Sequence, residues 1–336
     1  MKIFILTEGG SKIGAGHVTR CLSLYQAFLE LSYDIKIIVN GDEGIKKTLG
    51  NTNYLICDWL NNPNLIFNLI EKEDIIIIDS YLAPLQFYNK ISSNLFSIYI
   101  DDYRRLDYPN GIVINGIIKS NHFNYPTDKC KINLIGNKYI LLRKDFWNPP
   151  KREIKENITE IMVTFGNEDL RNLTPIIMKQ LNKINSNFIK NIIVGSGFQS
   201  ECIKLIEKLK DNNTNLFYSI DGKRMAEIMG SSDFAISAAG QTLNELACFG
   251  VPTFAITIID NQIDNANSFE SMGCLAGLTN YKNPNLAKNL KVTLEKFKSK
   301  GSRKGLSELL TKFIDGQGAR NVAKEVLNYY NSLQKR

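Results

Sequence analysis

Short, continuously apolar runs alternate with amphipathic stretches along most of the chain. Apolar residues recur at helical spacing from Val18 to Leu31, whereas the run before them, from Lys2 to Leu6, is short and almost wholly apolar. Such alternation is typical of βαβ units, in which parallel strands are joined by right-handed crossovers. The strands that it predicts cover residues 2–6, 35–39, 75–79, 97–101 and 112–114 in the first half of the chain, and 161–165, 191–194, 215–218, 234–237 and 253–257 in the second.

A polar segment interrupts the alternation near the middle. Asn148-Pro149-Pro150-Lys151-Arg152 is followed by charged residues up to Asn157, which predicts an interdomain linker over 149–157. A chain of 336 residues is also longer than an ordinary domain with a single hydrophobic core. We therefore expect an α/β fold with an N-terminal domain over 1–148 and a C-terminal domain over 158–317. A cleft between two such domains, with strand C-termini facing it, would enclose a ligand and exclude water.

The turn after the first predicted strand holds the strongest candidate for chemistry. Gly14-Ala15-Gly16-His17 leads from the strand into a helix, at the sheet edge where open α/β folds bind ligands. The N–H groups and dipole of that helix attract anions. His17, one of two histidines in the chain, can take a proton from water near pH 7. The alternative is a histidine that only caps the helix or binds phosphate, since Gly-x-Gly is common in turns.

A second candidate follows the strand predicted over 234–237. The small residues Ala239 and Gly240 allow backbone N–H groups to approach a pyrophosphate, and Gln241 and Thr242 lie at the predicted helix start. Glu245, one turn further along, can accept two hydrogen bonds from a ribose diol. An ordinary strand-turn-helix segment with a capping residue is the alternative.

Polar groups end several other predicted strands. Each group can be interpreted as part of a site or as a turn. For Asn261 and Gln262, a helix cap explains the pattern as well as a sugar site does. Gly166 is small enough to let a ligand approach the backbone. The residues are Asp79, Ser80 and Tyr81; Asp101 and Asp102; Gly166 and Asn167; and Asn261 and Gln262.

Composition narrows the class of protein. Hydrophobic residues make up 43% and charged residues 22%, which is typical of a soluble globular protein. No apolar run approaches the roughly 20 residues that span a bilayer, and Met1 leads directly into a strand, so we expect a cytoplasmic protein. The cysteines form no Cys-x-x-Cys pair, which argues against a zinc site and a disulfide framework. We expect Cys21, Cys57, Cys130, Cys202, Cys248 and Cys274 to be reduced and mostly packed.

The net charge of +7 is concentrated toward the C-terminus. Leu286, Leu290, Leu294 and Phe297 keep a helical apolar face there, so most of the basic residues in this stretch are interpreted as a solvated helix surface. Peripheral membrane contact is the alternative. Nucleic acid is not expected as a partner, because no aromatic and basic binding motif is present. The basic residues are Lys288, Lys291, Lys296, Lys298, Lys300, Arg303 and Lys304.

Taken together, these motifs resemble a known family, the UDP-sugar hydrolases of pseudaminic acid biosynthesis, which act on UDP-2,4-diacetamido-2,4,6-trideoxy-β-L-altropyranose. Spore-coat polysaccharide proteins and, more distantly, the lipid-linked N-acetylglucosaminyltransferase of peptidoglycan synthesis are related to that family. The resemblance runs from residue 1 to about 275. It is carried by Gly14 to Arg20, Ile78 to Tyr81, Asp101-Asp102, Leu141 to Phe146, Thr164 to Gly166, Ser237 to Glu245 and Asn261-Gln262.

The resemblance implies a GT-B architecture: two Rossmann-like domains with the active site between them and a last helix, over 318–333, that crosses back onto the first. It implies that His17 is the general base that activates water, with Tyr81 helping to place water or sugar, and that the reaction inverts C1. No metal or other cofactor is implied, and we expect a monomer whose partner is the UDP-sugar. The residues expected to bind substrate are Gly14, Gly16, Arg20, Asp79, Asp102, Gly166, Asn167, Ala239, Gly240, Gln241, Thr242, Glu245, Asn261 and Gln262.

Two positions depart from the family pattern, and both bear on the identity of the sugar more than on the type of reaction. Asn167 stands where many relatives have a second glycine, and Ser80 where a histidine can occur. The region from residue 280 onward carries no motif of the hydrolases except a helix start at 315–319. Two other functions stay open: an inverting GT-B glycosyltransferase that uses a UDP-sugar donor, and a nucleotide-sugar-binding protein without turnover.

Overall fold

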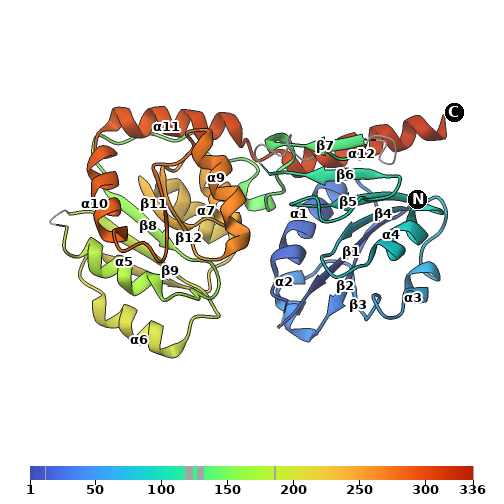
Figure 1. The fold of residues 1–336 in the computed structure, drawn as a ribbon, viewed down its shortest axis with the longest axis horizontal. Helices are drawn as coiled ribbons and strands as arrows, with labels where there is room; N and C mark the ends of the chain where they lie inside the picture. Colours follow the sequence, from blue (N-terminus) through green and yellow to red (C-terminus); the bar gives the residue numbers. More distant parts are fainter. Residues whose placement is uncertain (12, 118–123, 127–131, 185–186, 336) are drawn as a thin grey trace. The chain divides into compact units, whose positions relative to one another are not determined.

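The computed structural model describes residues 1–11, 13–117, 124–126, 132–184 and 187–335. The chain divides into two compact units, Met1–Lys144 with Gly316–Arg336, and Asp145–Asp315. Each unit is built on its own parallel sheet (Figure 1). The predicted α/β class with two parallel-sheet domains is therefore confirmed.

The sheet of the first unit has the strand order β3-β2-β1-β4-β5-β6-β7, and all neighbouring strands are parallel. Thr7 of β1 pairs with Asp79 of β4, so the ends of these two central strands meet at one edge. The strands are β1 (Ile3–Gly9), β2 (Ile35–Gly41), β3 (Tyr54–Ile56), β4 (Ile75–Asp79), β5 (Phe96–Ile100), β6 (Ile112–Asn115) and β7 (Ile132–Ile135).

Helices flank this sheet, and the longest of them comes from the C-terminal end of the chain. The helix α12 contacts α1, and its Tyr330 hydroxyl donates to the Glu73 carbonyl at 2.7 Å. Gly318 begins α12 against the backbone of Ile140, where a Cβ would lie 2.0 Å from the carbonyl oxygen. The α-helices of the first unit are α1 (Gly16–Glu30), α2 (Lys46–Leu49), α3 (Asn64–Phe67), α4 (Leu85–Ser92) and α12 (Gly318–Gln334).

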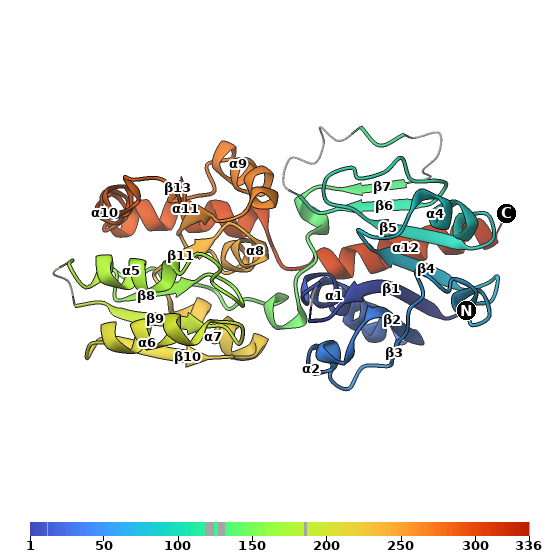
Figure 2. The ribbon, with the colours of Figure 1, turned by 60° about the horizontal axis from the view of Figure 1, so that its bottom comes forward.

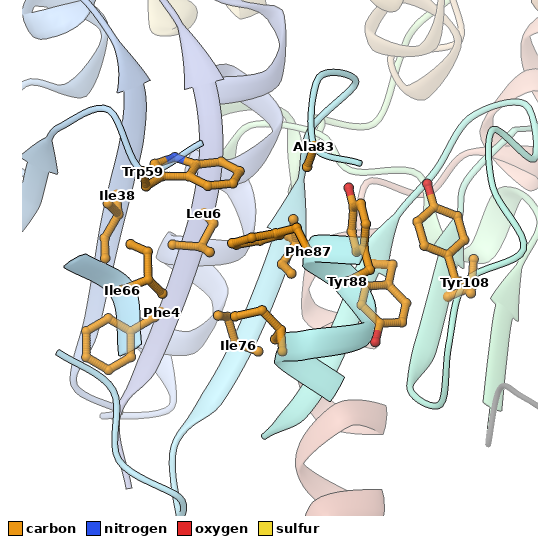
Figure 3. Packing of buried hydrophobic residues seen from close by; sticks show 14 of the residues in the cluster. Phe4, Leu6, Ile38, Trp59, Ile66, Ile76, Ala83, Phe87, Tyr88 and Tyr108 are labelled. Carbon is orange, nitrogen blue, oxygen red and sulfur yellow. The ribbon is translucent and has the colours of Figure 1, made fainter. Parts of the chain in front are cut away.

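One face of the sheet carries an aromatic core (Figure 3). Alternate strand residues point to opposite faces, so Phe4 and Leu6 of β1 pack together with Phe87 and Tyr88 of α4. Trp59 is fully buried in the same cluster and donates its indole N–H to the carbonyl of Thr7 at 3.1 Å. The core thus fixes the carboxyl end of β1, where polar residues begin.

The second unit repeats the design with the strand order β10-β9-β8-β11-β12-β13, again parallel throughout (Figure 2). Its strands are β8 (Glu160–Thr164), β9 (Ile189–Val194), β10 (Thr214–Tyr218), β11 (Phe234–Ala238), β12 (Thr253–Thr257) and β13 (Gly277–Asn280). Its helices are α5 (Leu173–Leu181), α6 (Ser200–Leu209), α7 (Gly222–Ser231), α8 (Gln241–Cys248), α9 (Ile263–Ser271), α10 (Leu286–Lys296) and α11 (Lys300–Phe313).

Every predicted strand is present, but β3, β7 and β13 were not predicted. All three are short strands at a sheet edge. Most of their residues are only half-buried, so their sequences carry a weaker apolar signal than the central strands do.

The prediction that most of the basic residues near the C-terminus form a solvated surface is confirmed, and Arg303 is the exception. The apolar face is buried as predicted, and the six lysines named with Arg303 are exposed. Arg303 is fully buried, because its position on α11 turns it inward, where its guanidinium donates to the carbonyls of Phe297, Lys155 and Glu156 at 2.8–3.1 Å.

Three further expectations concern cysteines, membranes and metals. Cys21, Cys57, Cys202, Cys248 and Cys274 are free thiols, and Cys130 lies outside the described residues. Within the described ranges, no helix is both long and apolar enough to cross a membrane. The same part of the chain contains no group of three or more His, Cys, Asp or Glu side chains arranged to hold a metal ion.

Candidate active site

The loop between β1 and α1 is closed by its own backbone. Gly10 and Gly14 exchange two hydrogen bonds, at 3.1 and 2.8 Å, and Gly14 has a φ of 84°, which favours glycine. Among the described residues, nothing lies within 4 Å of where a Cβ on Gly14 or Gly16 would project. The loop therefore presents bare backbone at the start of α1, next to His17.

His17 is held by a buried carboxylate at the end of β4. Its Nδ1 lies 2.7 Å from Oδ1 of Asp79, and Asp79 is fully buried. We assign the proton of the neutral ring to Nδ1, because the lone pairs of a bare nitrogen and of the carboxylate would repel each other, although Nη2 of Arg20 also lies 3.2 Å from Nδ1. The proton on Nδ1 leaves Nε2 as the basic nitrogen of the neutral ring. About one eighth of the His17 side chain is exposed (12%), so a small molecule can reach the ring.

Arg20, one turn further along α1, fixes that carboxylate. Its Nε lies 2.5 Å from Oδ2 of Asp79 and its Nη2 lies 2.6 Å from Oδ1. Burial alone would raise the pKa of Asp79, but Arg20 and His17 outweigh that effect and hold the pKa well below its usual range. Asp79 is therefore a permanent anion, and its oxygens are occupied by Arg20, His17 and the thiol of Cys21.

Tyr81 and Asp102 complete the surroundings of His17. Arg20 donates its Nη1 to Oδ2 of Asp102 at 2.6 Å, and the Tyr81 hydroxyl donates to the same oxygen. The Tyr81 ring meets the imidazole edge to face, with centroids 4.4 Å apart. Burial and the charge of Asp102 raise the pKa of Tyr81, so its hydroxyl stays protonated. Tyr81 thus contacts the candidate base directly, while 37% of its surface is exposed.

Glu8 belongs to this cluster but was not predicted. It is 1% exposed, and its carboxylate accepts hydrogen bonds from the Ser80 hydroxyl and the Tyr81 backbone N–H, both at 2.7 Å. Its Oε1 lies 3.8 Å from Nε2 of His17. The prediction ended the first strand at Leu6, and β1 continues to Gly9. A carboxylate at the carboxyl end of the first strand of an α/β sheet was the available signal.

The predicted residues of the second unit follow three of its strands, β8, β11 and β12. After β8, Gly166 has a φ of 80°, and the Asn167 side chain accepts from the backbone and hydroxyl of Ser196 at 3.2 and 2.8 Å. A Cβ on Gly195 would lie 2.2 Å from the Asn167 carbonyl. These contacts hold the loop after β8 against the loop after β9, next to Gly166, whose Cβ position has no neighbour within 4 Å among the described residues.

The segment after β11 meets the segment after β12. Ala239 accepts a hydrogen bond from the Asn265 side chain at 3.1 Å, and a Cβ on Gly240 would lie 3.4 Å from Nε2 of Gln262. Gln262 is held in turn by the backbone N–H of Ile258, at 3.0 Å. The start of α8 has no side-chain cap in the described part of the chain.

The remaining predicted residues differ in exposure. Gln241 and Asn261 are exposed and Thr242 is half-buried, whereas Glu245 is only 4% exposed on the inner side of α8. The predicted set is thus divided between the units: His17 and its partners lie in the first, and the loops from Gly166 to Gln262 lie in the second.

The chain is similar to several known proteins. Residues 160–324 match the model of the glycosyltransferase family 28 C-terminal domain. The chain is 26% identical over 275 residues to the uncharacterized protein MJ1062 of Methanocaldococcus jannaschii, covering 76% of this chain and 55% of that protein. It is 23% identical over 281 residues to the UDP-2,4-diacetamido-2,4,6-trideoxy-beta-L-altropyranose hydrolase of Campylobacter jejuni, covering 81% and 97%.

Solved structures establish the fold. Acinetobacter baumannii MurG superposes with a TM-score of 0.67 at 14% identity, covering 98% of this chain and 100% of that one. Arabidopsis thaliana UGT89C1 complexed with UDP superposes with a TM-score of 0.67 at 12% identity, covering 97% and 99%. The two parallel-sheet units thus belong to the GT-B fold, as predicted.

Proposed function

We propose that this chain is an enzyme that acts on UDP-sugars, as the family 28 C-terminal domain match over residues 160–324 supports, and that it cleaves them by hydrolysis. Its substrate is a UDP-activated diacetamido-trideoxy-hexose, and its products are UDP and the free sugar. The C. jejuni relative, named as such a hydrolase, supports this choice, as does a Helicobacter pylori relative whose name includes the same activity.

The pairing of His17 with Asp79 carries the proposal. A hydrolase needs a base that can take a proton from water, and the carboxylate on Nδ1 places the proton of the neutral ring there, so that Nε2 is the nitrogen that can accept a proton. Asp79 also stabilises the imidazolium that forms when the proton arrives. Because Arg20 holds Asp79 through two short contacts, the ring keeps its orientation before substrate binds.

The reaction we propose has one chemical step. His17 Nε2 accepts a proton from water as the oxygen attacks C1 of the sugar, and the bond from C1 to the diphosphate oxygen breaks. UDP leaves with the electron pair of that bond, the configuration at C1 inverts, and the imidazolium later returns its proton to solvent. Since a diphosphate is already a good leaving group, one base and oriented contacts can supply the catalysis.

We assign nucleotide binding to the second unit. The backbone of residues 239–242 at the start of α8 binds the diphosphate and stabilises the charge that develops on it. Glu245 binds the ribose, and Gly166, Asn167, Asn261 and Gln262 line the same region. In the first unit, Gly14 and Gly16 admit the sugar, Tyr81 positions water or sugar, and Arg20, Asp79 and Asp102 act by positioning His17 and Tyr81.

A glycosyltransferase is the second candidate, favoured by the family 28 match and by MurG among the structural neighbours. The two activities differ in their need for an acceptor. Purified protein is incubated with UDP-2,4-diacetamido-2,4,6-trideoxy-β-L-altropyranose and no acceptor, with UDP-N-acetylglucosamine in parallel. Release of UDP and free sugar in equal amounts from the first substrate supports the hydrolase. Tight UDP binding without release would favour a transferase or a different sugar.

A further inference from the structure

Glu8 differs from Asp79 and Asp102 in the charged groups that surround its carboxylate. Asp79 and Asp102 each receive a short contact from the Arg20 guanidinium. Within the described residues, the ion-pair partner of Glu8 within 4 Å is His17. A buried carboxylate without a cation costs free energy, and that cost falls when a neighbouring ring becomes positive. Glu8 is therefore placed to compensate the positive charge that the ring acquires in a proton-abstraction step.

The orientation of Glu8 is fixed independently of His17. The Ser80 hydroxyl donates to Oε2, and the Tyr81 backbone N–H donates to Oε1. Ser80 is itself held, because its hydroxyl accepts from the backbone N–H groups of Leu82 and Ala83 at 3.1 and 2.9 Å. Oε1 keeps a second lone pair, and this oxygen is the one that faces Nε2 of His17.

The separation between these two atoms suits one water molecule. At 3.8 Å, Nε2 and Oε1 are too far apart for a direct hydrogen bond. A water molecule at about 2.8 Å from each atom fits that separation and donates one O–H to each. We propose that Glu8 and His17 together hold the attacking water, with Glu8 as a second catalytic residue.

This inference rests on the proposed hydrolysis and adds a participant to it. The O–H that points to His17 breaks and its proton passes to Nε2, while the O–H that points to Glu8 remains in the new hydroxyl at C1. The oxygen lone pair released by the proton transfer is then aimed at the sugar. Glu8 neither gains nor loses a proton, and it compensates the imidazolium until the proton leaves.

The test is Glu8→Gln, which keeps the size of the side chain and an oxygen that accepts hydrogen bonds but removes the charge. We expect kcat to fall about 10- to 100-fold, while KM and the Kd for UDP stay within about twofold. The matched control is Asp74→Asn, another buried carboxylate of the first unit, which accepts the backbone N–H groups of Lys2 and Glu71 at the opposite end of β4. Its kcat should stay near the wild-type value.

A second variant keeps the proposal testable if the Glu8→Gln protein does not fold. Glu8→Asp keeps the charge, but its side chain is shorter by one methylene, which moves the carboxylate away from His17. This variant too should lower kcat without raising KM. The Glu8 role is overturned if Glu8→Gln turns over at the wild-type rate, if only KM changes, or if Asp74→Asn loses as much. Should Glu8→Gln fail to fold, a Glu8→Asp protein with wild-type melting and wild-type kcat overturns it. Failure of the wild type to release UDP would instead contradict the proposed hydrolysis itself.

Discussion

Nδ1 of His17 lies 2.7 Å from Oδ1 of Asp79, so a residue in the first turn of the first long helix is joined to the residue that ends the fourth strand. The parallel register of β1 and β4 brings these two positions together, although 62 residues separate them in the chain. The pairing decides which nitrogen of the ring carries the proton and which one can act as a base.

Replacing Asp79 by Asn should therefore damage turnover more than binding. The amide can donate to Nδ1, which shifts the proton of His17 to Nε2 and blocks the base. We expect kcat to fall by about two to four orders of magnitude, with the Kd for UDP within about threefold. Steady-state kinetics and calorimetric UDP titration measure both. A kcat within twofold of the wild type would remove Asp79 from the mechanism.

The same carboxylate should make stability depend on pH. The pKa of Asp79 is depressed in the folded protein, so its contribution is present above the unfolded value of about 4. That contribution is lost as the pH falls toward the folded value. The difference in unfolding free energy between wild type and Asp79→Asn, from urea titrations, should shrink as the pH falls below about 4. A difference that grows toward low pH would contradict this assignment.

Glu245→Ala should weaken UDP binding. A charge-assisted hydrogen bond to the ribose is lost, at a cost of about 1–3 kcal/mol, and calorimetry measures the change in Kd. Glu270→Ala is the control, because Glu270 is an exposed residue on α9 of the same unit. If the two variants bind UDP equally well, Glu245 does not contact the ribose.

Arg303 should be essential to the stability of the second unit. Arg303→Leu removes the Arg303 donor from three backbone carbonyls, and it removes the buried one of the two cations that lie 3.7 Å from Asp233, the other being the exposed Lys155. We expect a loss of about 3–5 kcal/mol in unfolding free energy. Lys304→Ala, its exposed neighbour, should cost less than about 0.5 kcal/mol. Chemical denaturation of both variants checks this, and equal losses would show that the buried contacts contribute little.

Cys248 should resist alkylation until the protein unfolds. Burial raises the pKa of its thiol to about 12, so very little thiolate exists at pH 8. Mass spectrometry after brief iodoacetamide treatment should show Cys248 unlabelled in native protein and labelled in urea. Rapid native labelling of Cys248 would mean that α8 opens readily.

The sequence predicted the central strands because each is an apolar run, and it located His17 because a glycine turn follows the first of them. The edge strands β3, β7 and β13 were not predicted, because their half-buried residues do not form a continuous apolar run. Glu8 was not predicted because the apolar run ends at Leu6, whereas β1 continues to Gly9. Arg303 was misread because a charged residue on an amphipathic helix usually faces solvent, and only the neighbouring carbonyls reveal that it does not.

The most direct test of the account is acceptor-free turnover in H₂¹⁸O, with wild type and His17→Asn compared on the diacetamido-trideoxy UDP-sugar. The account predicts equal amounts of UDP and free sugar from the wild type, no ¹⁸O in UDP because C1 is attacked, and a rate lower by about two to four orders of magnitude in His17→Asn, with UDP affinity retained. Label in the released UDP, or near-wild-type turnover by His17→Asn, would contradict it.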